Sequence, residues 1–599
     1  MEESYKIITL ADYFNESVRK FADKPSFGFV KGDCITYREL GNKVNELKEL
    51  FTRNGVEKGG KVAILGASCP NWPATYMAVT TSARIAVPVL PDFTAFEIAN
   101  ILEHSQTRAI VVSKRLLYKL SENIKEKLDL IILLDSFEII KGCECSEQKQ
   151  REINDSGLVP EAEDIASIIY TSGTSGTSKG VMLTHLNITT NIQMAFEVYP
   201  IDEHDVFLSL LPLSHAYECT VGMLYPLFMG CSVHYLDSAP TPSLLLPALK
   251  EVRPTCILSV PLIVEKIYKN KVRPIFTKNW AMQILYSIVP VRRMLHKIAG
   301  KKLVELFGGR LRFFGIGGAK LDGMVEHFLK DAGFPYAIGY GMTECSPLLA
   351  GAVGKFKFQT TGPKLKWMEM RIFNPDSNGI GEIQVKGPNI MKGYYRDEAR
   401  TEAAFTRDGW FKTKDLGKLD SNNSLYIKGR VDNMLIGANG ENIYPEEIEA
   451  VIRENDFVLE CLVTQIKGKL VAKVHFNYEQ INAIKELKDI EAEIRKNLKE
   501  RYEQFSEKYE QLSEKYKKLI PEFIDKRVGS FKENRAKAES TDLKEKVLIF
   551  NEKLEAVKRD LLAYVNERVN KSSKITVIME QIVPFEKTAT QKIKRYLYA

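Results

Sequence analysis

The sequence predicts an α/β fold, because short apolar runs alternate with amphipathic stretches throughout its first half. Runs such as KVAILGAS (61–68), RIAVPVL (84–90) and DLIILLD (129–135) have the length and the near-continuous apolar composition of buried strands. Intervening stretches such as 92–105 have the spacing of amphipathic helices. This alternation predicts a parallel sheet that is covered by helices on both faces.

The same rhythm continues beyond these strands and then changes near Gly379. Short segments bounded by turn residues follow, which is typical of a small antiparallel β subdomain. The large domain is therefore expected to contain layered α/β sheets together with this subdomain. Further buried strands are predicted at 108–113, 166–173, 254–260 and 311–318, and antiparallel strands at 381–387, 409–419 and 423–429.

The length of 599 residues predicts more than one domain. We place a large N-terminal domain at 1–430 and a small α+β domain at 431–599. The small domain opens with a predicted helix at 444–455, which two apolar strands follow.

A helical segment interrupts the small domain. Apolar residues recur at spacings of three and four over 484–519 and again over 543–564, with Pro521 between the two runs. We interpret 479–570 as an inserted coiled-coil hairpin. Because its charges nearly balance, a solvated helical surface is favoured over a nucleic-acid-binding arm, and self-association or docking on a membrane or a partner protein is left open.

Composition narrows the classes of function. The chain has 84 Lys and Arg against 77 Asp and Glu, a net charge of +7, so no nucleic-acid partner is expected. Nine cysteines in a chain of this length fit a reducing cytoplasm. No secretory signal, transmembrane run or amphipathic membrane anchor is evident, so we expect a cytoplasmic protein, with peripheral membrane contact and a homodimer left open.

The most informative segment is IIYTSGTSGTSKGVMLTH (168–185), in which an apolar strand enters a loop dense in Ser, Thr and Gly. Glycines allow backbone N–H groups to approach an anion, while hydroxyls and Lys179 add donors and charge. The pattern is not a Walker P-loop, because Ser178 stands where that motif requires glycine before the lysine. A polyphosphate-binding loop is favoured over a flexible linker.

With these segments in view, the sequence resembles the adenylate-forming superfamily, and within it the long-chain fatty acid–CoA ligases. The resemblance extends over nearly the whole chain and its motifs occur in the expected order. They are TYREL (36–40), GASCPNWPATYMA (66–78), YTSGTSGTSKGVMLTH (170–185), LPLSHAYE (211–218), GIGGAKL (315–321), YGMTECSP (340–347), GEIQVKGPNIMKGYY (381–395), GWFKTKDLG (409–417), IKGRVDNMLIGANGENIYPEEIE (427–449) and KTATQKIKR (587–595).

The resemblance implies an enzyme that uses ATP, Mg²⁺ and CoA. The carboxylate of a long-chain or medium-chain fatty acid would attack the α-phosphate of ATP, and CoA would then displace AMP from the acyl-AMP. Two anions meet in the first step, so positioning and charge neutralisation should dominate catalysis. The small domain would act as a mobile lid.

The resemblance also assigns site residues in the large domain. Tyr340 would stack on adenine, Gly341 would line the nucleotide or acyl pocket, and Thr343 would donate to the α-phosphate. Glu344 would hold Mg²⁺ together with Thr171. The phosphate loop would comprise Thr171, Ser172, Gly173, Thr174, Ser175, Gly176, Thr177 and Lys179, and the loop beside adenine would comprise Gly317, Gly318 and Ala319.

Further assignments lie at the hinge and in the lid. Asp415 would accept from both ribose hydroxyls and Arg430 would reach the ribose or a phosphate. Asp432 would be the hinge, and Lys592 would bridge the carboxylate and the α-phosphate. Gly440 is assigned to CoA binding. Finally, His215 would lie beside the reacting carboxylate, with Tyr217, Cys219 and Gly315 in the acyl pocket.

Three positions depart from the family pattern. Lys414, Gln591 and Lys320 stand where glycine, glycine and proline are usual. None of them removes a charged group that the chemistry needs. Three other functions remain under consideration: loading of an acyl carrier protein, ligation of an aryl or other acid to CoA, and a catalytically inactive scaffold.

Overall fold

The computed structural model forms two compact units, Met1–Met434 with Glu586–Leu597, and Leu435–Phe585 with Tyr598–Ala599. Each unit is described by itself. No helix within the described part of the chain is both long enough and apolar enough to cross a bilayer. The residues that the structure describes are 5–155, 157–171, 178–238, 240–277, 280–354, 357–437, 441–466, 468–481, 541–587 and 593–598.

The first unit contains an eight-stranded sheet in the order β18-β9-β8-β4-β3-β5-β6-β7. Its five central strands are parallel, as the apolar runs predict, but the three strands at its edges are antiparallel to their neighbours. The predicted parallel sheet is therefore confirmed for its central strands but was wrong at the edges, where consecutive strands such as β8 and β9 pair antiparallel without a crossover. The strands are β3 (Lys61–Leu65), β4 (Ile85–Val89), β5 (Ala109–Val112), β6 (Leu130–Leu133), β7 (Ile139–Lys141), β8 (Ile165–Thr171), β9 (Lys179–Thr184) and β18 (Gly393–Tyr394).

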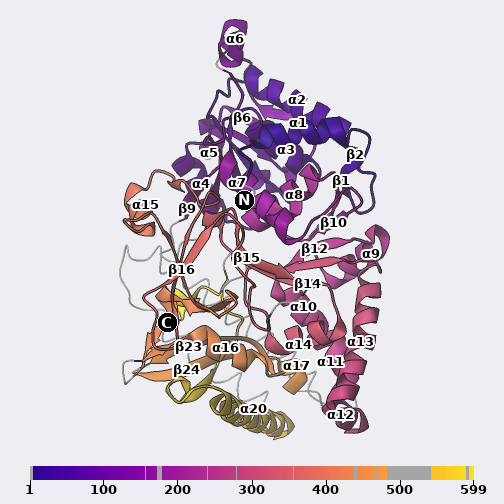
Figure 1. Cartoon of the computed structure of the whole chain (residues 1–599), viewed down its shortest axis with the longest axis vertical. Coiled ribbons are helices and arrows are strands. Elements are labelled where there is room, and N and C mark those ends of the chain that lie inside the picture. The colour runs from indigo at the N-terminus through magenta and orange to yellow at the C-terminus, as the bar shows by residue number, and fades with distance from the viewer. Residues whose placement is uncertain are drawn as a thin grey trace. The chain divides into compact units, whose positions relative to one another are not determined.

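A second eight-stranded sheet has the order β15-β14-β13-β12-β10-β11-β1-β2, with antiparallel strands at its two edges. Apolar residues of β12 to β14 form one core with helices α13 (Val289–Leu306) and α14 (Gly323–Ala332), which lie beside these strands in Figure 1. The strands are β1 (Pro25–Phe29), β2 (Ile35–Thr36), β10 (Val206–Ser209), β11 (Ser232–Tyr235), β12 (Cys256–Ser259), β13 (Phe313–Ile316), β14 (Tyr336–Gly341) and β15 (Leu348–Val353).

The predicted β subdomain is confirmed as a four-stranded antiparallel sheet in the order β16-β17-β19-β20. Its strands are β16 (Glu369–Phe373), β17 (Gly381–Lys386), β19 (Phe411–Leu419) and β20 (Leu425–Arg430). Other helices of the first unit are α1 (Leu10–Lys20), α2 (Tyr37–Arg53), α3 (Asn71–Thr80), α4 (Ala95–Ser105), α5 (Glu122–Lys127), α6 (Glu147–Asp155), α7 (His185–Val198), α8 (Tyr225–Phe228), α9 (Pro242–Val252), α10 (Pro261–Ile267), α11 (Arg273–Thr277), α12 (Trp280–Ser287) and α15 (Glu398–Ala404).

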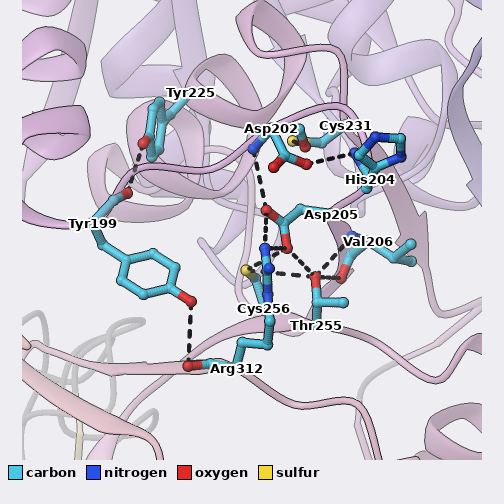
Figure 2. Close-up of polar contacts among 10 residues, drawn as sticks. All are labelled: Tyr199, Asp202, His204, Asp205, Val206, Tyr225, Cys231, Thr255, Cys256 and Arg312. Carbon is cyan, nitrogen blue, oxygen red and sulfur yellow. Dashed lines mark hydrogen bonds and ion pairs between the residues drawn. The ribbon is translucent and has the colours of Figure 1, made fainter. Parts of the chain in front are cut away.

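A buried carboxylate joins three strands of the second sheet at their amino-terminal ends. Figure 2 shows Asp205, directly before β10, within bonding distance of Arg312 and Thr255, which precede β13 and β12. Arg312 Nη2 lies 2.6 and 2.7 Å from the two carboxylate oxygens, and Thr255 Oγ1 donates to Oδ1 over 2.6 Å. The Asp205 side chain is wholly buried, whereas that of Arg312 is half exposed. The guanidinium and the threonine hydroxyl thus satisfy both oxygens of this buried carboxylate.

The second unit has a three-stranded sheet, β23-β24-β25, and a two-stranded ribbon, β21-β22. Of the two predicted hairpin helices, the one at 484–519 lies outside the described residues, and the other overlaps α20 (Thr541–Arg568). Leu554, Leu561 and Val565 of α20 are buried in the core of this unit. The other elements are β21 (Leu435–Ile436), β22 (Asn442–Ile443), α16 (Pro445–Arg453), β23 (Val458–Ile466), β24 (Lys469–Phe476), α17 (Tyr478–Ile481) and β25 (Val577–Glu580).

Candidate active site

The phosphate-loop segment forms a hairpin in which Thr171, the last residue of β8, pairs with Lys179, the first residue of β9. Residues 172–177 between them lie outside the described part of the chain. The Oγ1 atom of Thr171 is buried and has no hydrogen-bond partner among the described residues. A buried hydroxyl normally has a partner, so this atom is available to a ligand held by the hairpin.

Lys179 reaches two residues that are distant in the sequence. Its Nζ atom lies 2.5 Å from Oε1 of Glu344 and donates to the hydroxyl of Tyr394 over 2.8 Å. The Tyr394 hydroxyl in turn donates to the same carboxylate oxygen over 3.0 Å. Tyr394 is brought here because β18 pairs with β9, and Glu344 lies in the 3₁₀ turn η4 (Thr343–Cys345) after β14.

The Glu344 carboxylate is buried but remains ionised. Burial alone would raise its pKa, yet the charge of Lys179 and the bond from its ammonium group lower the pKa below the ordinary value. Lys179, Glu344 and Tyr394 thus form one charged cluster, which we call the Lys179 cluster. It combines a cation, a carboxylate and a hydroxyl at the base of the hairpin.

The loop after β13 and the end of β14 lie side by side because these two strands are parallel neighbours. The loop contains Gly317, Gly318 and Ala319. Added Cβ atoms at Gly315 and Gly317 would lie 2.9 and 3.2 Å from atoms of the Tyr217 ring and hydroxyl, so that ring packs directly against this loop. The structure therefore brings the two glycines and Tyr217 together, at the strand ends where ligands bind in open α/β sheets.

Gly341, at the end of β14, is a position where the backbone admits no side chain. A Cβ atom there would lie 1.9 Å from the carbonyl oxygen of Pro347, so any other residue would force the backbone apart. The tight approach fixes the path of the chain from Tyr340 to Thr343 and Glu344. Thr343 begins η4 and is partly exposed.

Tyr340, Asp415 and Arg430 form a second polar cluster. The Tyr340 hydroxyl donates to Oδ2 of Asp415 over 2.8 Å, and Arg430 Nε lies 3.0 Å from Oδ1. Asp415 and Arg430 are paired residues of β19 and β20. Burial and the nearby carboxylate raise the pKa of Tyr340, so its hydroxyl keeps its proton and remains a donor. Burial acts to lower the pKa of Arg430, but Asp415 raises it overall.

The expected hinge residue, Asp432, lies close to Lys414, one of the three residues that depart from the family pattern. Lys414 Nζ lies 3.5 Å from Oδ2 of Asp432, and both side chains are exposed enough for water to screen the pair. Lys414 has φ +59°, in the left-handed region that favours glycine. The backbone here thus has the conformation that suits the glycine of the family pattern.

The LPLSHAYE segment folds back on itself at His215. The backbone N–H of Tyr217 donates to His215 Nδ1 over 3.3 Å, and the N–H of Cys219 donates to the His215 carbonyl over 2.9 Å. His215 is partly exposed, whereas Cys219 is buried. The structure therefore keeps the imidazole at the edge of the core, close in the chain to Tyr217 and the Gly317 loop.

Glu218, next in this segment, was not singled out from the sequence. Its carboxyl is buried; Oε1 accepts from Ser209 Oγ over 2.6 Å, and Oε2 has no partner within the described residues. Burial raises the pKa of Glu218 to about 8, although the Ser209 bond opposes this. The group is therefore a neutral acid at physiological pH, at the start of the π-helical turn η2 (Glu218–Leu224).

Comparison with known proteins identifies the family. Residues 14–395, more than half of the chain, match the family described as "AMP-binding enzyme". The chain belongs to the AMP-binding enzyme family. This AMP-binding enzyme is similar to peroxisomal long chain acyl-CoA synthetase 6 of Arabidopsis thaliana. The two are 29% identical over 78% of this chain and 73% of that protein. It is also similar to 4-coumarate–CoA ligase 1 of the same plant, with 27% identity over 78% of this chain and 82% of that protein.

Solved structures share the fold of this AMP-binding enzyme. O-succinylbenzoate CoA synthetase of Bacillus subtilis, solved with AMP, has a TM-score of 0.69 at 20% identity, covering 98% of this chain and 97% of that one. ATP-bound MatB from Rhodopseudomonas palustris has a TM-score of 0.69 at 20% identity, covering 98% of each chain. At this identity the likeness establishes the architecture, and it confirms the predicted fold class of a large α/β portion with a smaller C-terminal domain.

Several assigned residues of this AMP-binding enzyme lie outside the described part of the chain, and their roles stay predictions. These are the loop residues Ser172, Gly173, Thr174, Ser175, Gly176 and Thr177, the CoA-binding assignment Gly440, and the lid lysine Lys592.

One site residue was missed although its motif was recognised. Tyr394 is the second-last residue of the segment GEIQVKGPNIMKGYY, and only the pairing of β18 with β9 places its hydroxyl in the Lys179 cluster. No local pattern distinguishes Tyr394 from Tyr395. A tyrosine two residues beyond a lysine in a short edge strand is not, by itself, a signal of function.

The residues near the hairpin fit a magnesium ion that takes its other ligands from phosphate. Among the described residues there is no group of three or more His, Cys, Asp or Glu side chains that could hold a metal alone. Glu344 offers an ionised carboxylate and Thr171 an unpartnered hydroxyl, both oxygen ligands of the kind Mg²⁺ prefers. Such a site would be completed by the nucleotide.

Proposed function

We propose that this AMP-binding enzyme activates a long-chain fatty acid with ATP and transfers the acyl group to CoA. In the first step a carboxylate oxygen forms a bond to the α-phosphorus and the bond to pyrophosphate breaks. In the second step the CoA sulfur bonds to the acyl carbon, the thiol loses its proton, and AMP leaves with the electron pair of the broken anhydride bond. Neither step requires a redox partner.

One observation carries the proposal: the convergence of Tyr340, Asp415 and Arg430 at the carboxyl end of β14. A carboxylate has two acceptor oxygens, which suits the two hydroxyls of a ribose. Asp415 would accept from these hydroxyls and Arg430 would reach the ribose or a phosphate. The Tyr340 ring would stack on the base, with the Gly317–Ala319 loop beside it.

The Lys179 cluster would receive the triphosphate. Lys179 would leave Glu344 for the β- and γ-phosphates, which the backbone of the hairpin would cradle. Glu344 and Thr171 would hold Mg²⁺, which when bound would neutralise phosphate charge. Thr343 would donate to the α-phosphate, where charge develops during attack.

The remaining roles follow the family pattern. Lys592 would bridge the carboxylate and the α-phosphate during adenylation, and the lid would then turn at Asp432 and present Gly440 to CoA. His215 would lie beside the reacting carboxylate.

A long-chain acid is favoured because long chain acyl-CoA synthetases are prominent among the relatives, including the human long-chain-fatty-acid–CoA ligase ACSBG2, 25% identical over 532 residues. An aryl acid is the alternative that 4-coumarate–CoA ligase 1 raises. Transfer to a carrier protein is a further alternative. We place the enzyme in the cytoplasm, with a homodimer left open.

An acid panel tests the substrate and the acceptor together. Pyrophosphate release is measured with ATP and Mg²⁺ across saturated acids of increasing length and across aryl acids, with and without CoA. We expect the highest kcat/KM with long-chain acids, and acyl-CoA and AMP only when CoA is present. If kcat/KM were higher for coumarate, an aryl acid would be the substrate in place of a fatty acid. If the acyl group were transferred only to a carrier protein, that protein would be the acceptor in place of CoA.

Lys592→Ala tests the lid. Loss of one positive charge at the α-phosphate should lower acyl-AMP formation by about 100-fold, while thioester formation from supplied acyl-AMP should remain. Lys594→Ala is the matched control, because Lys594 is a nearby cation that pairs with Glu586 at 3.8 Å. If Lys592→Ala lost both half-reactions equally, the proposed role of Lys592 in adenylation alone would be wrong.

A further inference from the structure

Residues 266–304 have an unusual charge composition. This stretch contains ten Lys or Arg residues and no Asp or Glu by count, although the whole chain has a net charge of only +7. It covers α11, α12 and most of α13. Such a local excess of one sign favours anionic partners. Asp331 of α14 pairs with Arg293, whereas Lys297, Lys301 and Lys302 are exposed.

The same helices expose aliphatic side chains at the junction of α12 and α13. Ile284, Leu285, Ile288 and Val289 are between 44% and 56% exposed. These four aliphatic residues lie close together in the chain, where α12 ends and α13 begins, so they form a patch and are not scattered singly over the surface. On α13, Met294 and Ile298 are 55% and 48% exposed and lie one turn apart.

Packing fixes which face of α13 is exposed. His296, Gly300 and Leu303 are buried, and a Cβ atom at Gly300 would lie 2.5 Å from the Ala332 carbonyl oxygen of α14. The helix therefore rests closely on α14. Its opposite face presents Met294 and Ile298 together with exposed Lys297, Lys301 and Lys302.

We propose that this face docks on a bilayer that contains anionic phospholipid. The α12–α13 surface consists of the exposed aliphatic residues named above at 284–298 together with Lys297, Lys301 and Lys302. Its aliphatic tip would enter the boundary between headgroups and acyl chains, while the lysines would bind lipid phosphates. In Figure 1, α12 and α13 adjoin each other at one edge of the drawing.

Charge complementarity favours a lipid over the other occupants. Two copies of this chain that met through the same surface would bring like charges together, which is unfavourable. A single-stranded nucleic acid is usually bound by aromatic side chains that stack on bases, whereas the exposed apolar side chains here are aliphatic. Aliphatic residues flanked by lysines are the pattern of interfacial membrane binding.

The surface is independent of the proposed reaction, and no amphipathic pattern in the sequence predicts it. The cations and the aliphatic residues are distributed over two helices, and neither helix has a long apolar stripe. Only the packing of α13 on α14 selects the side chains that face outward. If the fatty-acid substrate is also correct, the surface would place the enzyme where such acids dissolve.

The test measures sedimentation of the full chain with vesicles of phosphatidylcholine alone and of phosphatidylcholine mixed with phosphatidylglycerol. We expect affinity about tenfold higher for the anionic vesicles, falling as salt rises. Lys297→Glu/Lys301→Glu/Lys302→Glu should abolish most of this preference, a loss of about tenfold or more. Ile284→Ser/Ile288→Ser should weaken binding at high salt as well, because it removes buried apolar area.

The matched control is Lys31→Glu/Lys58→Glu/Arg115→Glu, which changes three exposed cations elsewhere. Each triple reversal lowers the net charge by six, from +7 to +1. The control should keep affinity within about twofold, and all variants should unfold within about 2 °C of the wild type. The proposal would be overturned if the control variant lost as much affinity as the triple lysine variant, or if the wild type showed no preference for anionic vesicles. It would also be overturned if the protein bound DNA instead of vesicles, or if the serine variant dissociated a dimer without any vesicle binding.

Discussion

The ammonium group of Lys179 lies 2.5 Å from the carboxylate of Glu344, although 165 residues separate them in the chain. We propose that Lys179 contacts phosphates and that Glu344 holds Mg²⁺. Without a nucleotide, each neutralises the other. The pair thus keeps a buried carboxylate ionised, and in the proposed function a phosphate would compete for the lysine.

Breaking this pair should change stability in a way that a double variant reveals. Lys179→Met leaves a buried carboxylate without its cation and should lower the free energy of unfolding by about 3 kcal/mol. Lys179→Met/Glu344→Gln removes both charges and should recover most of that loss. Urea unfolding measures both. Additive losses in the double variant would contradict direct coupling.

Catalysis should depend on the Glu344 carboxylate more than on Tyr394. Glu344→Gln removes the charge that would hold Mg²⁺ and should lower kcat/KM for ATP by about 100-fold. Tyr394→Phe removes one hydrogen bond to the same oxygen and should cost less than about tenfold. Pyrophosphate release at several Mg²⁺ concentrations measures both. A larger effect of Tyr394→Phe would mean that the hydroxyl, not the carboxylate, organises this cluster.

Asp415 should set the preference for a ribose. The wild type should use ATP with a kcat/KM about tenfold higher than that for 2′-deoxy-ATP, because the deoxy sugar leaves one acceptor unpaired. In Asp415→Ala this preference should disappear. Tyr340→Phe is the control, since it removes a donor to Asp415 but leaves both carboxylate oxygens. Retained discrimination in Asp415→Ala would place the ribose elsewhere.

Glu218 should make stability fall as pH rises. Its pKa is about 8 in the folded protein and near 4.5 when exposed, so between these values the folded state holds a proton that the unfolded state releases. The contribution of the neutral acid is complete below pH 4.5 and is lost as pH rises through 8. Relative to Glu218→Gln, the free energy of unfolding of the wild type should therefore fall by about 3 kcal/mol between about pH 5.5 and about pH 8.5.

Denaturant unfolding of both proteins at the two pH values measures this difference. Glu218→Gln keeps the shape and cannot ionise, so its own pH dependence reports every other group. A constant difference between the two proteins would show that Glu218 does not carry the buried proton.

Asp205 should be important for stability but not for catalysis. Asp205→Ala leaves Arg312 and Thr255 without their shared acceptor at the base of three strands and should cost about 3 kcal/mol. Arg312→Lys keeps a half-exposed cation and should cost about 1 kcal/mol, since a lysine cannot reproduce the paired bonds. Thermal unfolding gives both values. An Asp205→Ala variant as stable as the wild type would mean that the cluster in Figure 2 contributes nothing net.

Local features of this protein were readable from the sequence alone. Apolar runs predicted five of the eight strands in the first large sheet but only two of the eight in the second, and the Ser/Thr/Gly segment separates β8 from its antiparallel neighbour β9. These features depend on residues close together in the chain, where periodicity and turn chemistry act directly.

The tertiary structure decided which distant side chains meet. The sequence could not pair Tyr340 with Asp415, 75 residues away, or bring Tyr394 to Lys179, 215 residues away. It also could not predict antiparallel edges, a neutral Glu218, or the outward face of α13. Strand order and helix packing determine these features, because they set which groups lose water and which charges lie within a few ångströms of each other.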